Sequence, residues 1–257
     1  MLAQYAKFDP LHALDGLFVP RVNAGAMLNV SATVAGASVK FDGPQLGADH
    51  QSVLLAMVAR AGNQKPTHDP AALQTTGVVT DEKVMCVTVT KYQLLRDAGM
   101  SVNGGKDYRR LLSLLDDLAA VTMHREATRG PTSTRLISFE RNSDVGLPLL
   151  ILLNWRLSWA IAEDQFCYVS LEERRALKCP VSKVLHTWLS VYVRQGSKLA
   201  KNGAKIETLM RHVYPHYLQS GSPLRERKRR FLASLAAIAA LESWNISVGR
   251  IIEINRS

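Results

Sequence analysis

The sequence predicts an α+β fold made of two consecutive units with the same order of elements. Three observations support this prediction. A short helix, a turn, a longer helix and two strands follow one another twice along the chain. The two longer helices align without gaps, so that residues 109–118 match residues 229–238 with apolar side chains at the same positions. The polar segment 140–148 separates the units, and we therefore expect domains at residues 1–145 and 146–257.

The first unit begins with strands and a helix. Residues 28–41 are rich in β-branched side chains that partly alternate, which predicts a hairpin. The following run QSVLLAMVARA, residues 51–61, has apolar side chains on one helical face and predicts a helix. After a polar stretch, residues 84–90 (VMCVTVT) alternate and predict a strand.

A helix-turn-helix motif with a hairpin completes the first unit. Residues 91–100 predict a short helix that Gly99 ends, and residues 106–120 predict an amphipathic helix after the turn SVNGG. The segments 121–126 and 134–140 then predict a β-hairpin around the tip ATRGPTS. This order is that of the winged form of the helix-turn-helix.

The second unit repeats this order. Residues 181–195 and 205–215 predict two helices, and HYLQSGSPL predicts a turn. A long helix is expected over residues 222–241, followed by two strands around Gly249 within residues 244–256. The sequence therefore predicts two tandem winged-helix domains that arose by internal duplication.

The long helix of the second unit begins with a cluster of cations. A helix N-terminus already carries partial positive charge, so cations there are unfavourable unless an anion compensates them. In a helix-turn-helix, the first half of the second helix reaches base edges and phosphates in the DNA major groove. We therefore expect DNA-binding residues at this position in both units: Arg225, Arg227, Lys228, Arg229 and Arg230 in the second and Lys106, Arg109 and Arg110 in the first.

The duplication also suggests how these residues divide their tasks. Arg229 and Arg230 match Arg109 and Arg110, and a position shared by both units fits phosphate binding, which does not depend on base sequence. The unshared residues Arg225, Arg227 and Lys228 are predicted to include the base readers; the alternative is that all five cations of the second unit contact phosphates. The hairpin tips can lie along phosphates or enter the minor groove, where the candidate residues are Arg125, Arg129, Arg135 and Arg250.

Composition favours a cytoplasmic protein with an anionic partner. The 257 residues include 32 Lys and Arg against 22 Asp and Glu, a formal net charge of +10, which suits a polyanion. The three cysteines Cys86, Cys167 and Cys179 lie far apart, which argues against disulfides or a structural zinc site. The longest apolar stretch, residues 147–153, is far shorter than a membrane span, so we expect no membrane partner.

Enzymatic functions find little support. Residues 99–107 (GMSVNGGKD) resemble a phosphate-binding P-loop, but the glycine spacing is too long and Asp107 replaces the Ser or Thr that binds magnesium. His212 and His216 are the one close histidine pair, interrupted by a proline, and a zinc site there is the less favoured interpretation. Cys86 lacks a base that would activate it. We expect no catalytic residue, metal or cofactor, and we assign Trp155, Trp159, Trp188 and Trp244 to the core.

Several long blocks of the chain resemble one known family. They are FDPLHALDGLF, FDGPQLGADHQSVLLAMVARAG, ILLNWRLSWAIAEDQFCYVSLEERRAL, and IETLMRHVYP through RERKRRFLASLAAIAALESWNISV. In these blocks the chain resembles the replication initiator protein C family of IncQ-type plasmids. The resemblance implies binding to double-stranded plasmid origin DNA at direct repeats (iterons), opening of an adjacent AT-rich segment, and work with a plasmid-encoded helicase and primase. The wing REATRGPTSTR departs from the family pattern, so no iteron sequence is implied.

Two non-enzymatic alternatives stay open beside this interpretation. A winged-helix transcriptional repressor has similar basic helices, although it usually combines one such domain with a dimerisation or ligand module. A protein-interaction module that loads a helicase does not need the cations at positions 225–230. The oligomeric state is not predicted beyond a possible homodimer.

Overall fold

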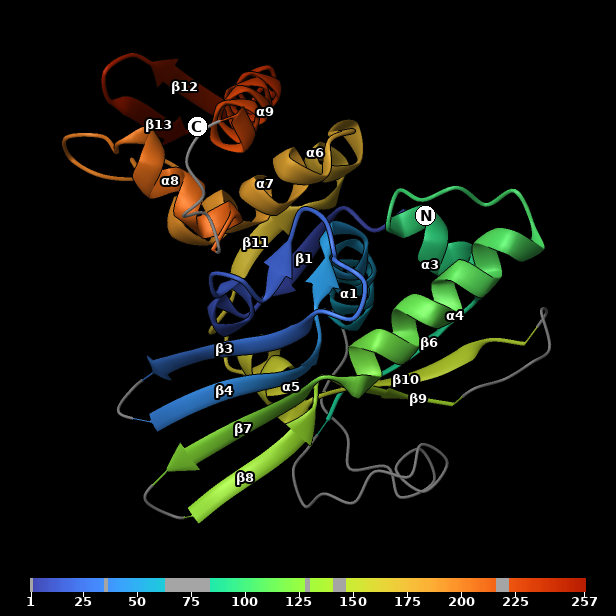
Figure 1. Cartoon of the computed structure of the whole chain (residues 1–257). Helices are drawn as coiled ribbons and strands as arrows, with labels where there is room; N and C mark the ends of the chain where they lie inside the picture. Colours follow the sequence, from blue (N-terminus) through green and yellow to red (C-terminus); the bar gives the residue numbers. More distant parts are fainter. Residues whose placement is uncertain (1, 35–36, 63–83, 128–129, 141–146, 216–221) are drawn as a thin grey trace.

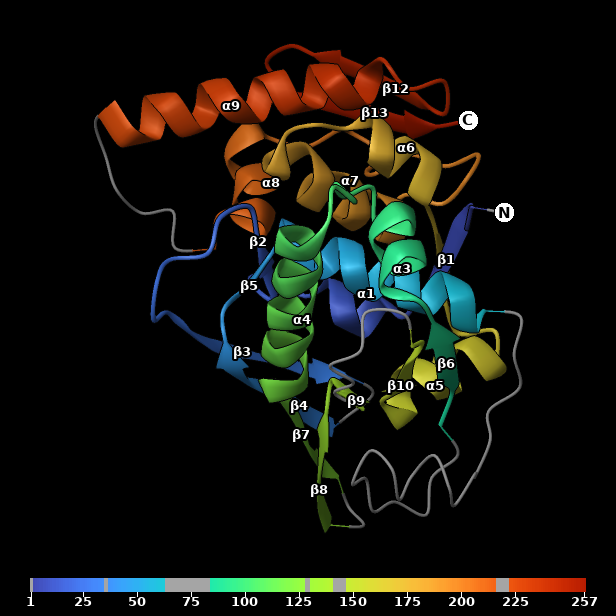
Figure 2. The same ribbon diagram turned by 90° about the vertical axis from the view of Figure 1, so that its right-hand side faces the viewer.

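The computed structural model describes residues 2–34, 37–62, 84–127, 130–140, 147–215 and 222–257. It has a mixed α/β architecture, as the sequence predicts, in which helices and small sheets alternate along the chain. A central body carries an extended sheet at one end and the C-terminal helices at the other (Figure 1). In the second view, α9 (Ser222–Ala239) runs along the top of the molecule and α4 (Gly105–Ala120) lies below it (Figure 2).

The first unit forms around α1 (Ala48–Ala61). The predicted hairpin is confirmed as β3 (Met27–Val34) and β4 (Ala37–Pro44). These strands extend into a four-stranded antiparallel sheet with the order β3-β4-β7-β8. Helix α1 is buried on almost all sides because β1, α3, α4 and α7 pack around it.

The two helices predicted before the first hairpin are present at the predicted positions. Strand β6 (Cys86–Val89) leads to α3 (Lys91–Asp97), and α4 follows after a turn. Gly99 ends α3 with a φ of +67°, a left-handed conformation that glycine adopts without strain. The side chain of Thr90 caps α3 by accepting a hydrogen bond from the backbone N–H of Gln93 at 3.2 Å.

The predicted hairpin after α4 is more divided than the sequence suggests. Strand β7 (Thr122–Ala127) pairs with β8 (Gly130–Arg135), which is shorter than the predicted strand 134–140 and begins within the predicted tip. Residues 137–139 instead form β9 (Ile137–Phe139), which joins a second sheet with the order β6-β10-β9. Leu136, Ile137 and Ser138 are all buried in succession, a pattern that a single strand with one solvent-facing side cannot satisfy. The chain therefore changes sheet at Leu136.

The second unit has the predicted order of elements. Helices α7 (Pro180–Tyr192), α8 (Ile206–Val213) and α9 precede the antiparallel hairpin of β12 (Trp244–Val248) and β13 (Ile252–Arg256). The segment between α7 and α8 adds isolated bridges to β13 at Lys198 and Ala204. A second hydrophobic cluster includes Leu185, Leu189, Phe231 and Leu235 of these helices, together with Ala48 of α1.

The segment that connects the units packs with the first one. Strand β10 (Leu149–Leu153) and α5 (Trp155–Ala162) contribute buried side chains to the first core. Strand β11 (Cys167–Ser170) pairs with the N-terminal β1 (Tyr5–Phe8), and α6 (Leu171–Ala176) follows it. The domain boundary at residues 145 and 146 stays a prediction, and this packing favours a boundary closer to α6.

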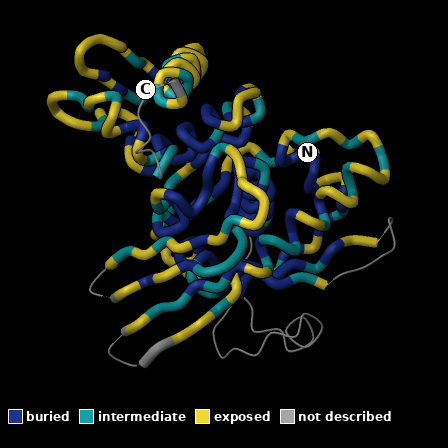
Figure 3. Tube along the Cα trace, in the orientation of Figure 1, coloured by how far each residue is buried: buried dark blue, intermediate teal, exposed yellow. Residues whose placement is uncertain are grey.

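A short 3₁₀ helix and two short strands complete the first unit. The 3₁₀ helix spans Pro10–Ala13, and β2 (Phe18–Val19) pairs in parallel with β5 (Leu46–Gly47). Burial is highest in the central body, whereas α9 and the outer ends of the hairpins are largely exposed (Figure 3). None of the described helices is long and apolar enough to cross a membrane.

Glu173 on α6 holds the second unit together through its carboxylate. It accepts hydrogen bonds from Nε2 of His186 at 2.7 Å, from Nε1 of Trp244 at 3.2 Å and from the hydroxyl of Ser243. Burial alone would raise the pKa of Glu173, but these hydrogen bonds lower it to about 2, against an ordinary value of 4.5. The ionised carboxylate therefore stabilises the packing of α6 on α7 and β12.

This depressed pKa predicts a specific loss of stability in acid. The stabilisation by Glu173 is present above about pH 4.5 and disappears as the pH falls toward 2. In this range the carboxylate takes up a proton more readily in the unfolded protein than in the folded protein, so protonation favours unfolding. We expect Glu173→Gln to lower the free energy of unfolding by about 3 kcal/mol at neutral pH, and by progressively less as the pH falls. Urea unfolding at pH 7, 4 and 2.5 measures this, with the exposed neighbour substitution Glu172→Gln as the control. An equal effect of Glu173→Gln at all pH values would contradict the assignment.

Candidate nucleic-acid interface

The first half of α9 presents its cations to solvent while its second half is anchored. Phe231, Leu235 and Ile238 are fully buried in the second core. Arg229 lies on the opposite side of the helix from the buried positions at 3.6 residues per turn. Arg225, Lys228 and Arg230 are also exposed, on the two flanks. The burial of α9 thus leaves a basic surface at its N-terminal end.

Glu226 partly compensates this basic surface. Its carboxylate accepts two hydrogen bonds from Arg229, both at 2.8 Å, and one from Nε of Arg230 at 2.6 Å. Hydrogen bonds from Arg229 and Arg230 lower the pKa of Glu226 to about 2, so it stays ionised at neutral pH. Both arginines are therefore paired within the helix, and a phosphate that binds them must compete with Glu226. Glu226 is not among the residues predicted from the sequence, although Glu with Arg three and four positions later is a recognisable helical pattern.

The remaining cations of α9 have different environments. Lys228 lies 3.4 Å from a carboxylate oxygen of Glu207 on α8. Arg227 is only partly exposed and lies over the ring of Tyr214, with its guanidinium carbon 5.8 Å from the ring centroid. For Arg225, no hydrogen-bond or ion-pair partner is found among the described residues. Of the three predicted base readers, Arg225 and Lys228 are thus exposed and Arg227 is only partly so, and Lys228 is in addition paired with Glu207.

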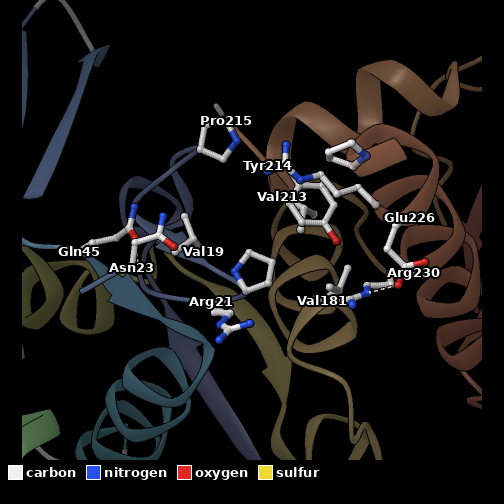
Figure 4. A pocket seen from close by; sticks show the side chains of 13 residues that line it. Val19, Arg21, Asn23, Gln45, Val181, Val213, Tyr214, Pro215, Glu226 and Arg230 are labelled. Atoms are coloured by element: carbon white, nitrogen blue, oxygen red, sulfur yellow. Dashed lines mark hydrogen bonds and ion pairs between the residues drawn. The ribbon is translucent and has the colours of Figure 1, made fainter. Parts of the chain in front are cut away.

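A pocket of about 360 Å³ opens beside the start of α9. Its walls come from the segment after β2, from the end of α8 and from α9, and Figure 4 shows Arg21 on one side and Arg230 with Glu226 on the other. Arg227 also lines it, so three arginines and one glutamate contribute to its walls. Burial raises the pKa of Tyr214 in this pocket to about 12, which keeps its hydroxyl protonated. Arg21 comes from the first unit and was not predicted from the sequence.

Helix α4 repeats this arrangement with fewer cations. Leu111, Leu115 and Leu118 are fully buried, which matches the burial of Phe231, Leu235 and Ile238 in the predicted alignment. The matched cations are exposed on both helices, Arg109 and Arg110 on α4 and Arg229 and Arg230 on α9. Lys106 is also exposed at the N-terminal end of α4, but its counterpart on α9 is Glu226.

Two of the α4 cations already have partners. Nε of Arg109 donates a long hydrogen bond, 3.4 Å, to the carbonyl of Gly105 in its own helix. Arg110 forms an ion pair with Asp49 of α1. The start of α4 is therefore less available to an external anion than its charge alone indicates.

The stretch that resembles a P-loop has a structural explanation. Asp107 accepts hydrogen bonds from the hydroxyl of Ser101 and from the backbone N–H of Asn103, both at 2.8 Å. These hydrogen bonds lower its pKa. The carboxylate thus closes the turn between α3 and α4 and occupies the end of the helix where a P-loop would hold a phosphate.

The predicted hairpin residues are not equivalent. Arg125 on β7 covers Trp155, with its guanidinium carbon 5.7 Å from a ring centroid of that side chain. Arg135 at the end of β8 and Arg250 between β12 and β13 are exposed. Arg129 lies outside the described residues. Arg135 and Arg250 are therefore the described hairpin cations most accessible to DNA.

The predicted histidine pair has a structural role at His212. Nδ1 of His212 donates a 2.7 Å hydrogen bond to a carboxylate oxygen of Asp15, and its ring stacks on Trp188 with ring centroids 4.0 Å apart. His216 lies outside the described residues. No group of three His, Cys, Asp or Glu side chains with metal-binding geometry is found in the described part of the chain.

Trp188 and Trp244 are buried as predicted, but Trp159 is 41% exposed, so its assignment to the core is wrong. It lies on the outer face of α5, where the guanidinium carbon of Arg156 is 4.6 Å from a ring centroid of Trp159.

Comparisons with known proteins agree with an interpretation as a replication protein. A family model described as Replication protein C (RepC) matches residues 3–256. A crystal structure of a selenomethionine derivative of domains 2 and 3 of RctB is similar, with a TM-score of 0.55, 11% identity, and 95% of this chain and 97% of that chain covered. A second crystal structure of RctB domains 2–3 gives a TM-score of 0.50 at 11% identity, with 93% and 92% covered. At this identity, the likeness shows the fold alone. No curated protein sequence gives a significant match.

Proposed function

The chain belongs to the replication protein C (RepC) family, and we propose on this basis that it is a plasmid replication initiator that binds iteron repeats in origin DNA. In this proposal each unit is a winged-helix domain, with α4 and α9 as the recognition helices and the hairpins β7–β8 and β12–β13 as the wings. The proteins that share this work are a plasmid-encoded helicase and primase, and binding promotes the opening of an AT-rich segment.

One observation carries the proposal more than any other. The N-terminal end of α9 exposes four cations, Arg225, Lys228, Arg229 and Arg230, next to an apolar half that fixes the helix in its unit. A DNA major groove accepts one α-helix and presents phosphates along both of its edges. A helix that is anchored at one end and cationic at the other suits this geometry. The equal burial phase of α4 supports a second contact of the same kind.

Binding to origin and random duplexes tests the function. We expect the protein to bind the origin repeats at least about 10³-fold more tightly than a scrambled duplex of the same length at physiological salt. Fluorescence anisotropy with labelled duplexes measures both affinities. Equal affinities would leave a general DNA-binding role, and the absence of duplex binding would favour the helicase-loading module. Tight binding to an operator outside the origin would favour the repressor.

Removal of Glu226 is expected to strengthen general DNA binding. In Glu226→Gln, the guanidinium groups of Arg229 and Arg230 no longer need to leave a carboxylate before they bind phosphate. We expect severalfold tighter binding to random duplex and a lower ratio of specific to random binding, because the added electrostatic attraction does not depend on sequence. The control is Glu242→Gln, which removes the same charge from an exposed position beyond the other end of α9. Weaker duplex binding by Glu226→Gln would contradict the proposed competition.

A further inference from the structure

The ribbon formed by β1 and β11 has an outward face made of aromatic and cationic side chains. In the antiparallel register Tyr5 lies opposite Ser170 and Lys7 opposite Tyr168. The alternate residues Ala6 and Phe8 are fully buried in the first core. The outward side chains of β1 are thus Tyr5 and Lys7, and on the other strand they are Tyr168 and the preceding Phe166.

These side chains form one continuous group. The rings of Tyr5 and Tyr168 meet edge to face at 6.2 Å, and those of Phe166 and Tyr168 at 5.1 Å. Nζ of Lys7 lies 4.7 Å from the ring centroid of Phe166. Tyr5 and Tyr168 are 55% and 54% exposed, although aromatic side chains of this size are usually covered. Ring faces and a cation are therefore available to a ligand on this ribbon.

A cavity of about 510 Å³ adjoins the ribbon and adds further cations. Arg194, Arg256, Tyr5 and Tyr168 line it together with the end of the chain. Arg256 is held in place, since it donates to the carbonyls of Tyr168 and Ser190 at 3.5 and 3.3 Å and lies over Trp244. Arg194 is exposed, and no hydrogen bond or ion pair of its side chain is found among the described residues. The carboxylate in the cavity, Glu173, is already bound to His186, Ser243 and Trp244.

We propose that this ribbon and its cavity bind single-stranded DNA. Exposed rings beside cations match the requirements of a strand with unpaired bases, because bases stack on the rings while the cations neutralise phosphates. Bases in a duplex are already stacked on one another, so the rings favour a single strand. The cations and the occupied carboxylate favour a polyanion over an apolar or basic protein segment.

The surface is separate from the proposed duplex interface. Its cavity reaches Ser243, just beyond the C-terminal end of α9, whereas the basic residues lie at the N-terminal end of that helix. A helix of this length separates its ends by about 25 Å. The inference thus goes beyond the proposed function and does not depend on it.

Binding of fluorescein-labelled dT20 to the full chain tests the inference. The wild-type protein should bind dT20, and the double substitution Tyr5→Ala with Tyr168→Ala should weaken this binding at least about 30-fold, since each stacked ring contributes about 1–3 kcal/mol. Tyr5→Phe with Tyr168→Phe keeps the rings and should retain most of the affinity. Tyr92→Ala is the matched control. Tyr92 is an exposed tyrosine beside a cation, Arg96, but it lies on α3, away from the ribbon.

Two further readouts make the result unambiguous. Unchanged thermal unfolding and unchanged duplex binding by the Tyr5→Ala, Tyr168→Ala variant would show that the fold and the duplex interface are intact. Photocrosslinking of iodouracil-substituted single strands should label Tyr5, Phe166 or Tyr168. The inference is overturned if wild-type protein does not bind dT20, which would leave the ribbon as a docking face for another protein. It is overturned equally if the double alanine variant binds as wild type does, or if crosslinks fall only on α4 and α9.

Discussion

Replacement of Arg225, Lys228, Arg229 and Arg230 by alanine is expected to weaken binding to origin duplex about a thousandfold near 0.15 M salt. Each phosphate contact that releases a counterion contributes about 0.9 to the slope of log affinity against log salt. The slope should therefore fall by about 1.8 if only Arg229 and Arg230 contact phosphate, and by about 3.6 if Arg225 and Lys228 do so as well. These side chains are all exposed and none of them packs in the core. Alanine is the best helix former, and the loss of cations from a helix N-terminus is favourable, so the helix should remain folded. Circular dichroism and titrations over a range of salt concentrations measure both effects.

The matched comparison is the removal of Lys106, Arg109 and Arg110 from α4. We expect a smaller loss, about a hundredfold or less, because this set has fewer cations and Arg110 is paired with Asp49. The C-terminal unit would then provide the stronger grip on DNA. An equal or larger loss from the α4 substitutions would reverse this order. No loss from either set would place the duplex interface elsewhere on the molecule.

The burial of the two long helices could be predicted from the sequence because helical periodicity is a local property. The same spacing that matches Leu111 with Phe231 and Leu118 with Ile238 places all four side chains in a core. Exposure of the adjacent arginines follows from the same phase. Their partners do not follow from it, since Arg110 pairs with a residue of α1 that lies far away in sequence. The sequence therefore indicated where the cations lie, but not how many are free to bind DNA.

The β1–β11 ribbon could not be predicted, because its two strands are short and lie more than half the chain apart. Nothing in the sequence YAKF or CYVS identifies the other strand as its partner, since strand pairing depends on the tertiary arrangement. The pairing of β11 with β1 also holds the chain after residue 146 against the first unit, where β10 and α5 pack. Trp159 was assigned to the core because it lies in an apolar helical pattern. Such a pattern shows which residues share a helix face, but it does not show that every aromatic residue is buried, and in the short helix α5 Trp159 lies on the outer face.

The ribbon is anchored by Asp9, a buried carboxylate directly after β1. It accepts hydrogen bonds from Nε and Nη2 of Arg156 on α5 at 2.9 and 3.2 Å, and from the backbone N–H of Leu11 at 3.2 Å. Nδ1 of His12 lies 3.2 Å from the same carboxylate. Burial alone would raise the pKa of Asp9, but His12 and Arg156 lower it below its ordinary value of 3.8. Asp9 thus joins the N-terminal segment to α5, although Asp9 and Arg156 are 147 residues apart in the sequence.

Substitution Asp9→Ala is expected to lower the free energy of unfolding by about 3 kcal/mol at neutral pH, because the loss of one partner leaves a partly buried charge on Arg156 and removes the cap of the 3₁₀ helix. Urea unfolding monitored by tryptophan fluorescence measures the change. The control is Asp42→Ala, whose exposed carboxylate pairs with Lys40 and should contribute less than about 1 kcal/mol. Since the pKa of Asp9 is depressed, its contribution is present above about pH 4 and is lost as the pH falls further. The difference between wild type and Asp9→Ala should therefore shrink in acid, and a small, pH-independent difference would show that the Asp9–Arg156 pair does not hold the ribbon in place.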